Sequence, residues 1–276
     1  MNPITEVALV TGRELRRSFR STKGVLLAVL SIAAGAGFSM LFAWLDRVKR
    51  EKLPSGTDWR AAQEQFFSQW YAPDTGKALS SCPFSLWMML IATLWLAPWL
   101  VALMAFDAAS GEMQHRTVCF WTIRVHRASY MIGKGLGAWT AVVAVTLGMN
   151  LVVWAATIAV GHWPAADVIV WGARFFAVTL PISAAWCGIA TLVGSQFKTP
   201  ILSLLFICAS FFCLWLLRVT AGFAQAHWLA YAYPNAFDAL LLSPNLVDAG
   251  RGLVSTGLIA LATTTAAALV FQRKDV

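Results

Sequence analysis

The sequence predicts an all-α, polytopic membrane protein with six transmembrane helices and with both termini in the cytoplasm. Of its 276 residues, 59% are hydrophobic and only 12% are charged, and its mean hydropathy is +0.66. A soluble domain carries about 25% charged residues, so this chain has too little polar surface for water. In lipid every backbone amide has to be paired within the protein, and long apolar runs meet that requirement as helices.

Six apolar runs are long enough to cross the roughly 30 Å hydrocarbon core, which takes about 20 helical residues. They are residues 24–45, 84–106, 137–160, 169–193, 201–219 and 252–271. The fourth run is the least regular, because it contains Arg174 near its start and Pro181 in its middle. We expect the Arg174 side chain to extend to the nearby interface.

The basic residues set the orientation. Twelve of the 21 Lys and Arg residues, but only five of the 13 acids, fall on the side that holds both termini. Lys and Arg are retained on the cytoplasmic side, which places the termini there. The formal net charge of +8 is therefore a signal of membrane orientation and does not indicate nucleic-acid binding.

Residues 1–23, ahead of the first span, have the pattern of an amphipathic helix. Its apolar positions are Ile4, Ala8, Leu15 and Phe19, and its basic positions are Arg13, Arg16, Arg17 and Arg20. Such a helix lies flat on the inner membrane surface. It either only anchors the first span on anionic lipid or also contacts a cytoplasmic partner.

Residues 24–276 form the transmembrane domain, with two notable regions on the outer side. The loop 46–83 contains a capping pair, Ser55 and Asp58, followed by Trp59, Ala62, Phe66 and Trp70 on one helical face. These aromatic residues are expected to rest on the membrane interface, and binding of a substrate or an outer-side accessory protein is the alternative. The region 220–251 is too apolar for a solvated loop and is expected to re-enter the membrane, with turns at Pro234 and Pro244.

Residues for catalysis or cofactor binding are not found in the sequence. It has no phosphate-binding loop of the form G-x-x-x-x-G-K-S/T, and its four histidines lack metal-ligand spacing. The five cysteines are odd in number and scattered, which indicates neither a disulfide framework nor a metal site. We therefore expect no enzyme activity and no bound cofactor or metal, and any energy has to come from another subunit.

The loop 107–134, between the second and third spans, has the most informative pattern. Asp107 stands at the membrane boundary, and Glu112 and Arg116 are four residues apart. An apolar stretch follows, consisting of Val118, Phe120, Trp121, Ile123 and Val125. Exposed aromatic residues rimmed by charge are typical of a docking surface. The alternative is a helical hairpin whose apolar face packs back on the bundle.

The order of residues in this loop resembles the cytoplasmic loop of ABC-2 type transporter permeases. The matching positions are Asp107, Ala108, Gly111, Glu112, Thr117, Arg127, Gly133 and Lys134. The chain departs from the family pattern at Arg116, where a glycine is common, and at Arg124, near the position of a common proline. Six spans, internal termini and an apolar segment before the last span agree with the resemblance.

The resemblance implies the membrane subunit of an ABC exporter in a bacterial-type cytoplasmic (inner) membrane. Two permease chains, identical or different, would pair, and two ABC ATPase subunits holding ATP and Mg²⁺ would dock beneath them. The implied coupling residues are Asp107, Gly111, Glu112, Arg116, Thr117, Phe120, Trp121, Arg127 and Lys134. Glu112 and Arg116 would shape the loop, and Phe120 and Trp121 would fill a groove of the ATPase. A structural or receptor-like membrane subunit without transport activity is the alternative function.

Overall fold

The computed structural model describes residues 2–52, 59–115, 117–160 and 163–273. These residues form helices and no strand. Six helices among them are long and apolar enough to cross a membrane, which confirms the predicted number of spans. They are α2 (Thr22–Lys52), α5 (Phe84–Ala105), α8 (Arg127–Val160), α9 (Ala165–Gly194), α10 (Pro200–Phe223) and α13 (Leu246–Gln272).

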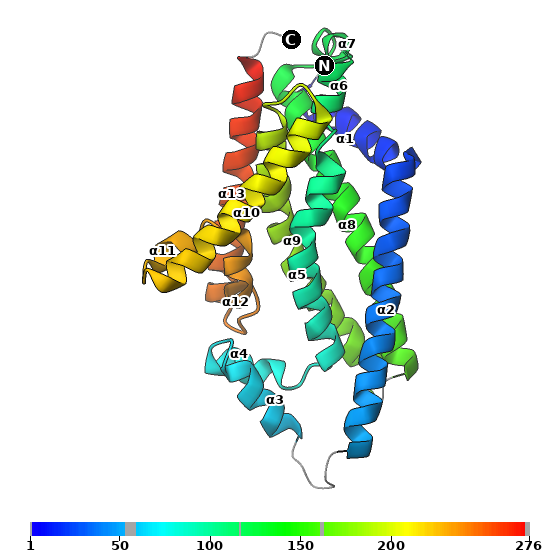
Figure 1. Ribbon diagram of the computed structural model, residues 1–276, viewed down its shortest axis with the longest axis vertical. Helices are drawn as coiled ribbons and strands as arrows, with labels where there is room; N and C mark the ends of the chain where they lie inside the picture. Colours follow the sequence, from blue (N-terminus) through cyan, green and yellow to red (C-terminus); the bar gives the residue numbers. More distant parts are fainter. Residues whose placement is uncertain (1, 53–58, 116, 161–162, 274–276) are drawn as a thin grey trace.

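The spans form one elongated bundle, and both termini lie at the same end of it (Figure 1). We call this end the terminal end and the opposite one the distal end. Helix α9 lies in the middle of the bundle and contacts α5, α8 and α13. Its Trp186 and Ile182 are fully buried, whereas α2 and α10 lie at the periphery and expose most of their apolar side chains.

Short helices cover both ends. At the terminal end, α1 (Pro3–Arg20) lies across the bundle, and α6 (Ser110–Gln114) and α7 (Val118–Thr122) lie in the connection from α5 to α8. At the distal end, α3 (Trp59–Ser68) packs against α4 (Pro73–Leu79).

Helix α3 contacts the protein through Gln63 and Phe67, and through one of the predicted aromatic positions, Phe66, whose ring centroid lies 5.6 Å from that of Trp87. Gln63 and Phe67 are buried, and Phe67 packs on Trp87 of α5 with ring centroids 5.1 Å apart. Ala62 and Trp70 are exposed, so the contact of their face with the membrane interface stays a prediction. Ser55 and Asp58 lie outside the described residues, and so does the predicted capping interaction.

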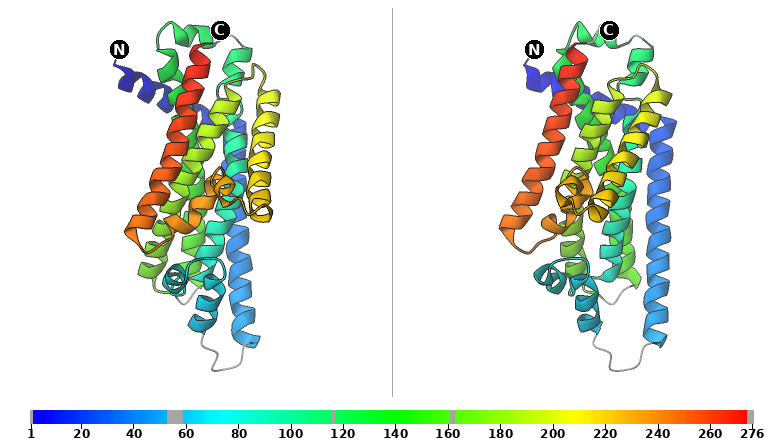
Figure 2. Two further views of the ribbon diagram at one scale, coloured as in Figure 1. Left: turned by 90° about the vertical axis from the view of Figure 1, so that its left-hand side faces the viewer. Right: turned by 60° about the vertical axis from the view of Figure 1, so that its left-hand side comes forward.

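Between α10 and α13 the chain forms α11 (His227–Ala230), a 3₁₀ turn η1 (Pro234–Phe237) and α12 (Asp238–Leu241). We call residues 224–245 the inserted segment, because it lies beside the bundle at about half its height (Figure 2). The Arg174 guanidinium donates a hydrogen bond to the Leu242 carbonyl, with an N–O distance of 2.9 Å. Arg174 thus holds the inserted segment, and the extension of its side chain to the membrane interface stays a prediction.

Asn235 fastens the inserted segment to the middle of α5. Pro98 lies inside α5 and has no N–H for the carbonyl of Leu94, four residues earlier. The Asn235 Nδ2 donates to that carbonyl at 2.8 Å, and the Asn235 Oδ1 accepts from the Trp186 indole at 2.8 Å. One amide therefore joins α5, α9 and the inserted segment, and it satisfies the carbonyl that the proline leaves free.

Candidate functional site

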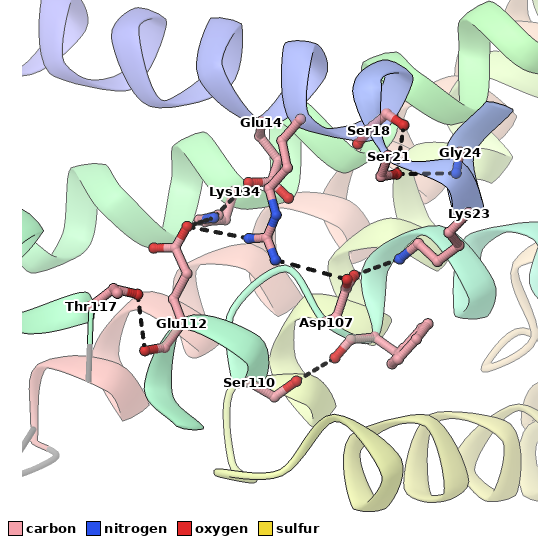
Figure 3. Close-up of polar contacts among 12 residues, drawn as sticks. Glu14, Ser18, Ser21, Lys23, Gly24, Asp107, Ser110, Glu112, Thr117 and Lys134 are labelled. Atoms are coloured by element: carbon pink, nitrogen blue, oxygen red, sulfur yellow. Dashed lines mark hydrogen bonds and ion pairs between the residues drawn. The ribbon is translucent and has the colours of Figure 1, made fainter. Parts of the chain in front are cut away.

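A buried group of charged side chains lies at the terminal end, between α1, α6 and α8. The Lys134 ammonium of α8 is only 3% exposed and contacts two carboxylates. It lies 2.5 Å from Glu14 Oε2 on α1 and 2.7 Å from Glu112 Oε1 on α6. The Tyr130 hydroxyl donates to the second Glu112 oxygen at 2.8 Å, so the Glu112 carboxylate binds partners through both oxygens. Figure 3 shows Glu112 and Glu14 facing Lys134.

The group extends toward the start of α2. Arg17 of α1 lies 3.3 Å from Glu112 Oε1 and 3.8 Å from Asp107 Oδ2. The Lys23 ammonium at the start of α2 lies 2.6 Å from Asp107 Oδ1. These residues, which we call the charge cluster, are Glu14, Arg17, Lys23, Asp107, Glu112 and Lys134. Its three acids and three bases balance, which removes the large cost of an unpaired buried charge.

Two glycines of α8 allow α1 to approach closely enough for these contacts. A Cβ atom at Gly133 would lie 2.7 Å from the Val10 Cβ, and one at Gly137 would lie 2.6 Å from the Glu14 Cβ. A side chain at either position would therefore force α1 or its side chains to shift. The four-residue spacing places both glycines on one face of α8, and they form the seat for α1.

The face of α1 that meets the bundle is polar, and its apolar stripe points away. Glu6, Val10 and Glu14 are buried and recur every four residues. Ile4 and Phe19 on the opposite side are exposed. The predicted apolar side is therefore free to contact lipid, which stays a prediction.

Glu6 holds the far end of the connection from α5 to α8. Its carboxylate accepts a hydrogen bond from the backbone N–H of His126 at 3.1 Å. Burial disfavours the charged carboxylate, but hydrogen bonds from His126 and Ser129 outweigh it and lower the pKa of Glu6 below its ordinary value. Glu6 is therefore charged at neutral pH and fixes the turn that precedes α8.

Helix α7 is anchored by apolar residues on either side and presents two others. Val118 and Val125 are buried, while Phe120 is 73% and Ile123 is 82% exposed. Trp121 has a different environment, because the Arg13 guanidinium stacks 4.0 Å from the centroid of its ring. Phe120 and Ile123, rather than Trp121, form the exposed apolar surface of this loop.

The structure brings together three of the predicted coupling residues, Asp107, Glu112 and Lys134, in the charge cluster. Gly111 lies beside Arg17. The Thr117 backbone N–H donates to the Glu112 carbonyl at 3.0 Å and closes the turn after α6. The other predicted residues lie apart from the cluster: Arg127 donates to the Gln272 carbonyl, Phe120 and Trp121 belong to α7, and Arg116 is outside the described residues.

Sequence reasoning did not identify the partners that α1 contributes. Glu14 and Arg17 lie about 100 residues before Glu112 and Lys134, so no local spacing links them. A signal was present, however, because Glu6 and Glu14 interrupt a basic helix and share one face with Val10. Acids that recur on one face of a basic helix indicate a contact with other basic residues.

The described part of the chain shows no group of three or more His, Cys, Asp or Glu side chains that could hold a metal ion. The charge cluster is fully paired, so its chemistry is to hold helices together. Comparisons with protein-family models and with curated proteins give no match for this chain.

Proposed function

We propose that this protein is the membrane subunit of an ABC transporter of the ABC-2 type. It would pair with a second permease chain and with a separate ATPase to move a substrate across or out of a bacterial-type cytoplasmic membrane. In this proposal the terminal end faces the cytoplasm, ATP and Mg²⁺ bind to the partner ATPase, and the chain itself catalyses no reaction.

The observation that carries the proposal is the apolar pair formed by Phe120 of α7 and Ile123, which directly follows α7. Both side chains are exposed, and α7 lies beyond the ends of the spans (Figure 1), where water would otherwise surround it. The buried Val118 and Val125 fix α7 on either side, so the pair is presented by a rigid support. Exposed apolar anchors rimmed by charge are typical of protein interfaces.

The charge cluster supports the proposal because it connects α7 with the spans. Glu112 precedes α7 by six residues and binds Lys134 of α8 and Arg17 of α1. Asp107, at the end of α5, binds Lys23 at the start of α2. A push on α7 by a docked ATPase would therefore be transmitted to α1, α2, α5 and α8 together.

The test is affinity purification of the tagged protein from its native membranes in mild detergent, with partners identified by mass spectrometry and ATP hydrolysis assayed in the same sample. The double variant Phe120→Ser/Ile123→Ser removes two exposed anchors worth at least about 1 kcal/mol each, so recovery of the ATPase should fall roughly 30-fold. Phe223→Ser is the matched control. Phe223 is also an exposed apolar residue, with 87% of its surface exposed, but it is the last residue of α10 and does not belong to the loop that contains α7.

An ATPase that co-purifies equally with the double variant and the control would contradict docking through α7. A homo-oligomer without ATPase and without any response to nucleotide would favour the alternative, a structural or receptor-like membrane subunit.

A further inference from the structure

A pocket with a volume of about 230 Å³ opens on the side of the bundle between α5 and α10. Aromatic side chains form its walls: Trp95 and Trp99 of α5, Phe212 and Trp215 of α10, Trp186 of α9 and Tyr233 of the inserted segment. Trp95 and Phe212 are at least half exposed, so the mouth of the pocket lies on the outer surface of two candidate spans. Hydrocarbon would surround this mouth in a bilayer.

The inner wall of the pocket at Trp186 offers no polar partner to an occupant. The Trp186 indole N–H already donates to Asn235, and the Asn235 amide in turn donates to Leu94. The wall therefore has no free buried donor at Trp186 for a polar ligand, which would lose its hydration without a new partner.

The volume limits the size of the occupant. An apolar cavity of about 150 Å³ holds a single benzene ring, whereas sites for drug-sized ligands measure about 300–1,000 Å³. A pocket of about 230 Å³ thus suits a segment of one hydrocarbon chain.

Arg218 lies next to the pocket and supplies a positive charge. It follows Trp215 by three residues on α10, and its guanidinium stacks 5.2 Å from the centroid of the Tyr233 ring. Arg218 is exposed, and no acid of the described residues lies within 4.0 Å of it. An arginine on the surface of a spanning helix needs an anionic partner, and the guanidinium matches a phosphate group in geometry.

Arg218 lies five residues before the C-terminal end of α10, where the chain enters the inserted segment. Asp238 of α12 attracts this guanidinium, but the two side chains are farther apart than the 4.0 Å of an ion pair. A phosphate group could therefore make the direct contact with Arg218 that Asp238 does not make.

We propose that this pocket holds one acyl chain of an anionic membrane phospholipid whose headgroup phosphate binds Arg218. The proposal requires that the six spans lie in lipid, but it does not depend on an ATPase partner, so the two proposals stand or fall separately.

The test uses the full-length protein in nanodiscs of phosphatidylcholine with a small fraction of phosphatidylglycerol that carries a diazirine on its acyl chain. After illumination, labelled peptides are mapped by mass spectrometry. Labelling should be enriched at the α5 and α10 wall residues over Val254 and Leu258, exposed apolar residues of α13. Arg218→Gln should lower this labelling about tenfold, the order expected for loss of one charge-assisted hydrogen bond.

Arg251→Gln is the matched control, because Arg251 is also an exposed arginine but is paired with Asp248. Equal labelling of the pocket and of α13 would overturn the proposal, since it would indicate only surrounding bulk lipid. The proposal would also be overturned if both arginine variants behaved alike, if a phosphatidylcholine probe labelled the pocket as strongly, or if a second copy of the chain were cross-linked there.

Discussion

Replacing Lys134 with methionine should release α1 from the bundle. The lysine nitrogen lies 2.5 Å from a Glu14 oxygen and 2.7 Å from a Glu112 oxygen, so these two oxygens are no more than about 5 Å apart. Without the ammonium, two carboxylates would face each other in a buried site. At an effective dielectric constant of about 20, their repulsion amounts to about 3 kcal/mol. Loss of one partner from a buried ion pair typically costs about 3–5 kcal/mol, which agrees.

Trypsin provides the assay, because Arg16 and Arg20 of α1 are exposed but become cleavable only when the helix opens. Cleavage under these conditions follows the population of the open form. A loss of about 3 kcal/mol raises that population on the order of 100-fold. We expect cleavage in α1 of the Lys134→Met protein to be faster by a similar factor.

Two comparisons decide whether the charges are responsible. Lys77→Met removes an exposed lysine of α4 and should leave cleavage in α1 unchanged. Adding Glu14→Gln to Lys134→Met restores the charge balance of the cluster and should recover part of the protection. The reasoning is refuted if Lys134→Met is cleaved no faster than Lys77→Met, or if Glu14→Gln makes the lysine variant still less stable.

Two further predictions concern packing and hydrogen bonds. Gly137→Ala should lower the free energy of unfolding by about 1–3 kcal/mol, measured by thermal unfolding in detergent, because the added Cβ would overlap α1. Gly148→Ala in the same helix is the control, since its Cβ has room and the substitution should be neutral or stabilising. Equal effects of the two substitutions would argue against the glycine seat. Asn235→Leu leaves the Trp186 indole N–H and the Leu94 carbonyl unpaired, and it should lower the free energy of unfolding by about 1–3 kcal/mol for each of them. Adding Pro98→Ala should recover part of this loss, because the alanine supplies an N–H to the Leu94 carbonyl. If the second substitution gives no recovery, the pairing of Asn235 with Leu94 is contradicted.

The spans were predictable because hydropathy is a local property of the chain. The expected starts at residues 84 and 201 agree with α5 at Phe84 and α10 at Pro200. Helix α13 begins at Leu246, six residues before the expected start at 252, and α8 differs most, since it begins at Arg127, ten residues before the expected start at 137. Residues 127–136 include Lys134, whose charge conceals the helix in a hydropathy profile. Carboxylates from α1 and α6 neutralise that charge, and no local pattern reveals them.

For the candidate site, the sequence predicted the residues of the loop 107–134 but not those of α1. The order of Asp107, Glu112 and Lys134 along the loop indicated a functional unit, but their spacing did not reveal that Glu14 and Arg17 complete it. The apolar stripe of α1 dominates its pattern, so the sequence indicated the exposed side of α1 and not the side that packs on α8. A buried polar face can be recognised only when its distant partners are known.

Pro98 gives α5 a point at which the helix can bend. Helix α5 is continuous from Phe84 to Ala105, but Leu94 and Pro98 share no hydrogen bond, so the helix bends more easily there than elsewhere. The Asn235 side chain donates a hydrogen bond to the free Leu94 carbonyl at this point. A large bend of α5 at this point would break the hydrogen bond from Asn235, unless the inserted segment moved together with the helix. A movement that starts at the charge cluster would therefore be opposed halfway along the bundle, because it would have to break the hydrogen bond from Asn235 to Leu94. Breaking this bond costs about 1–3 kcal/mol.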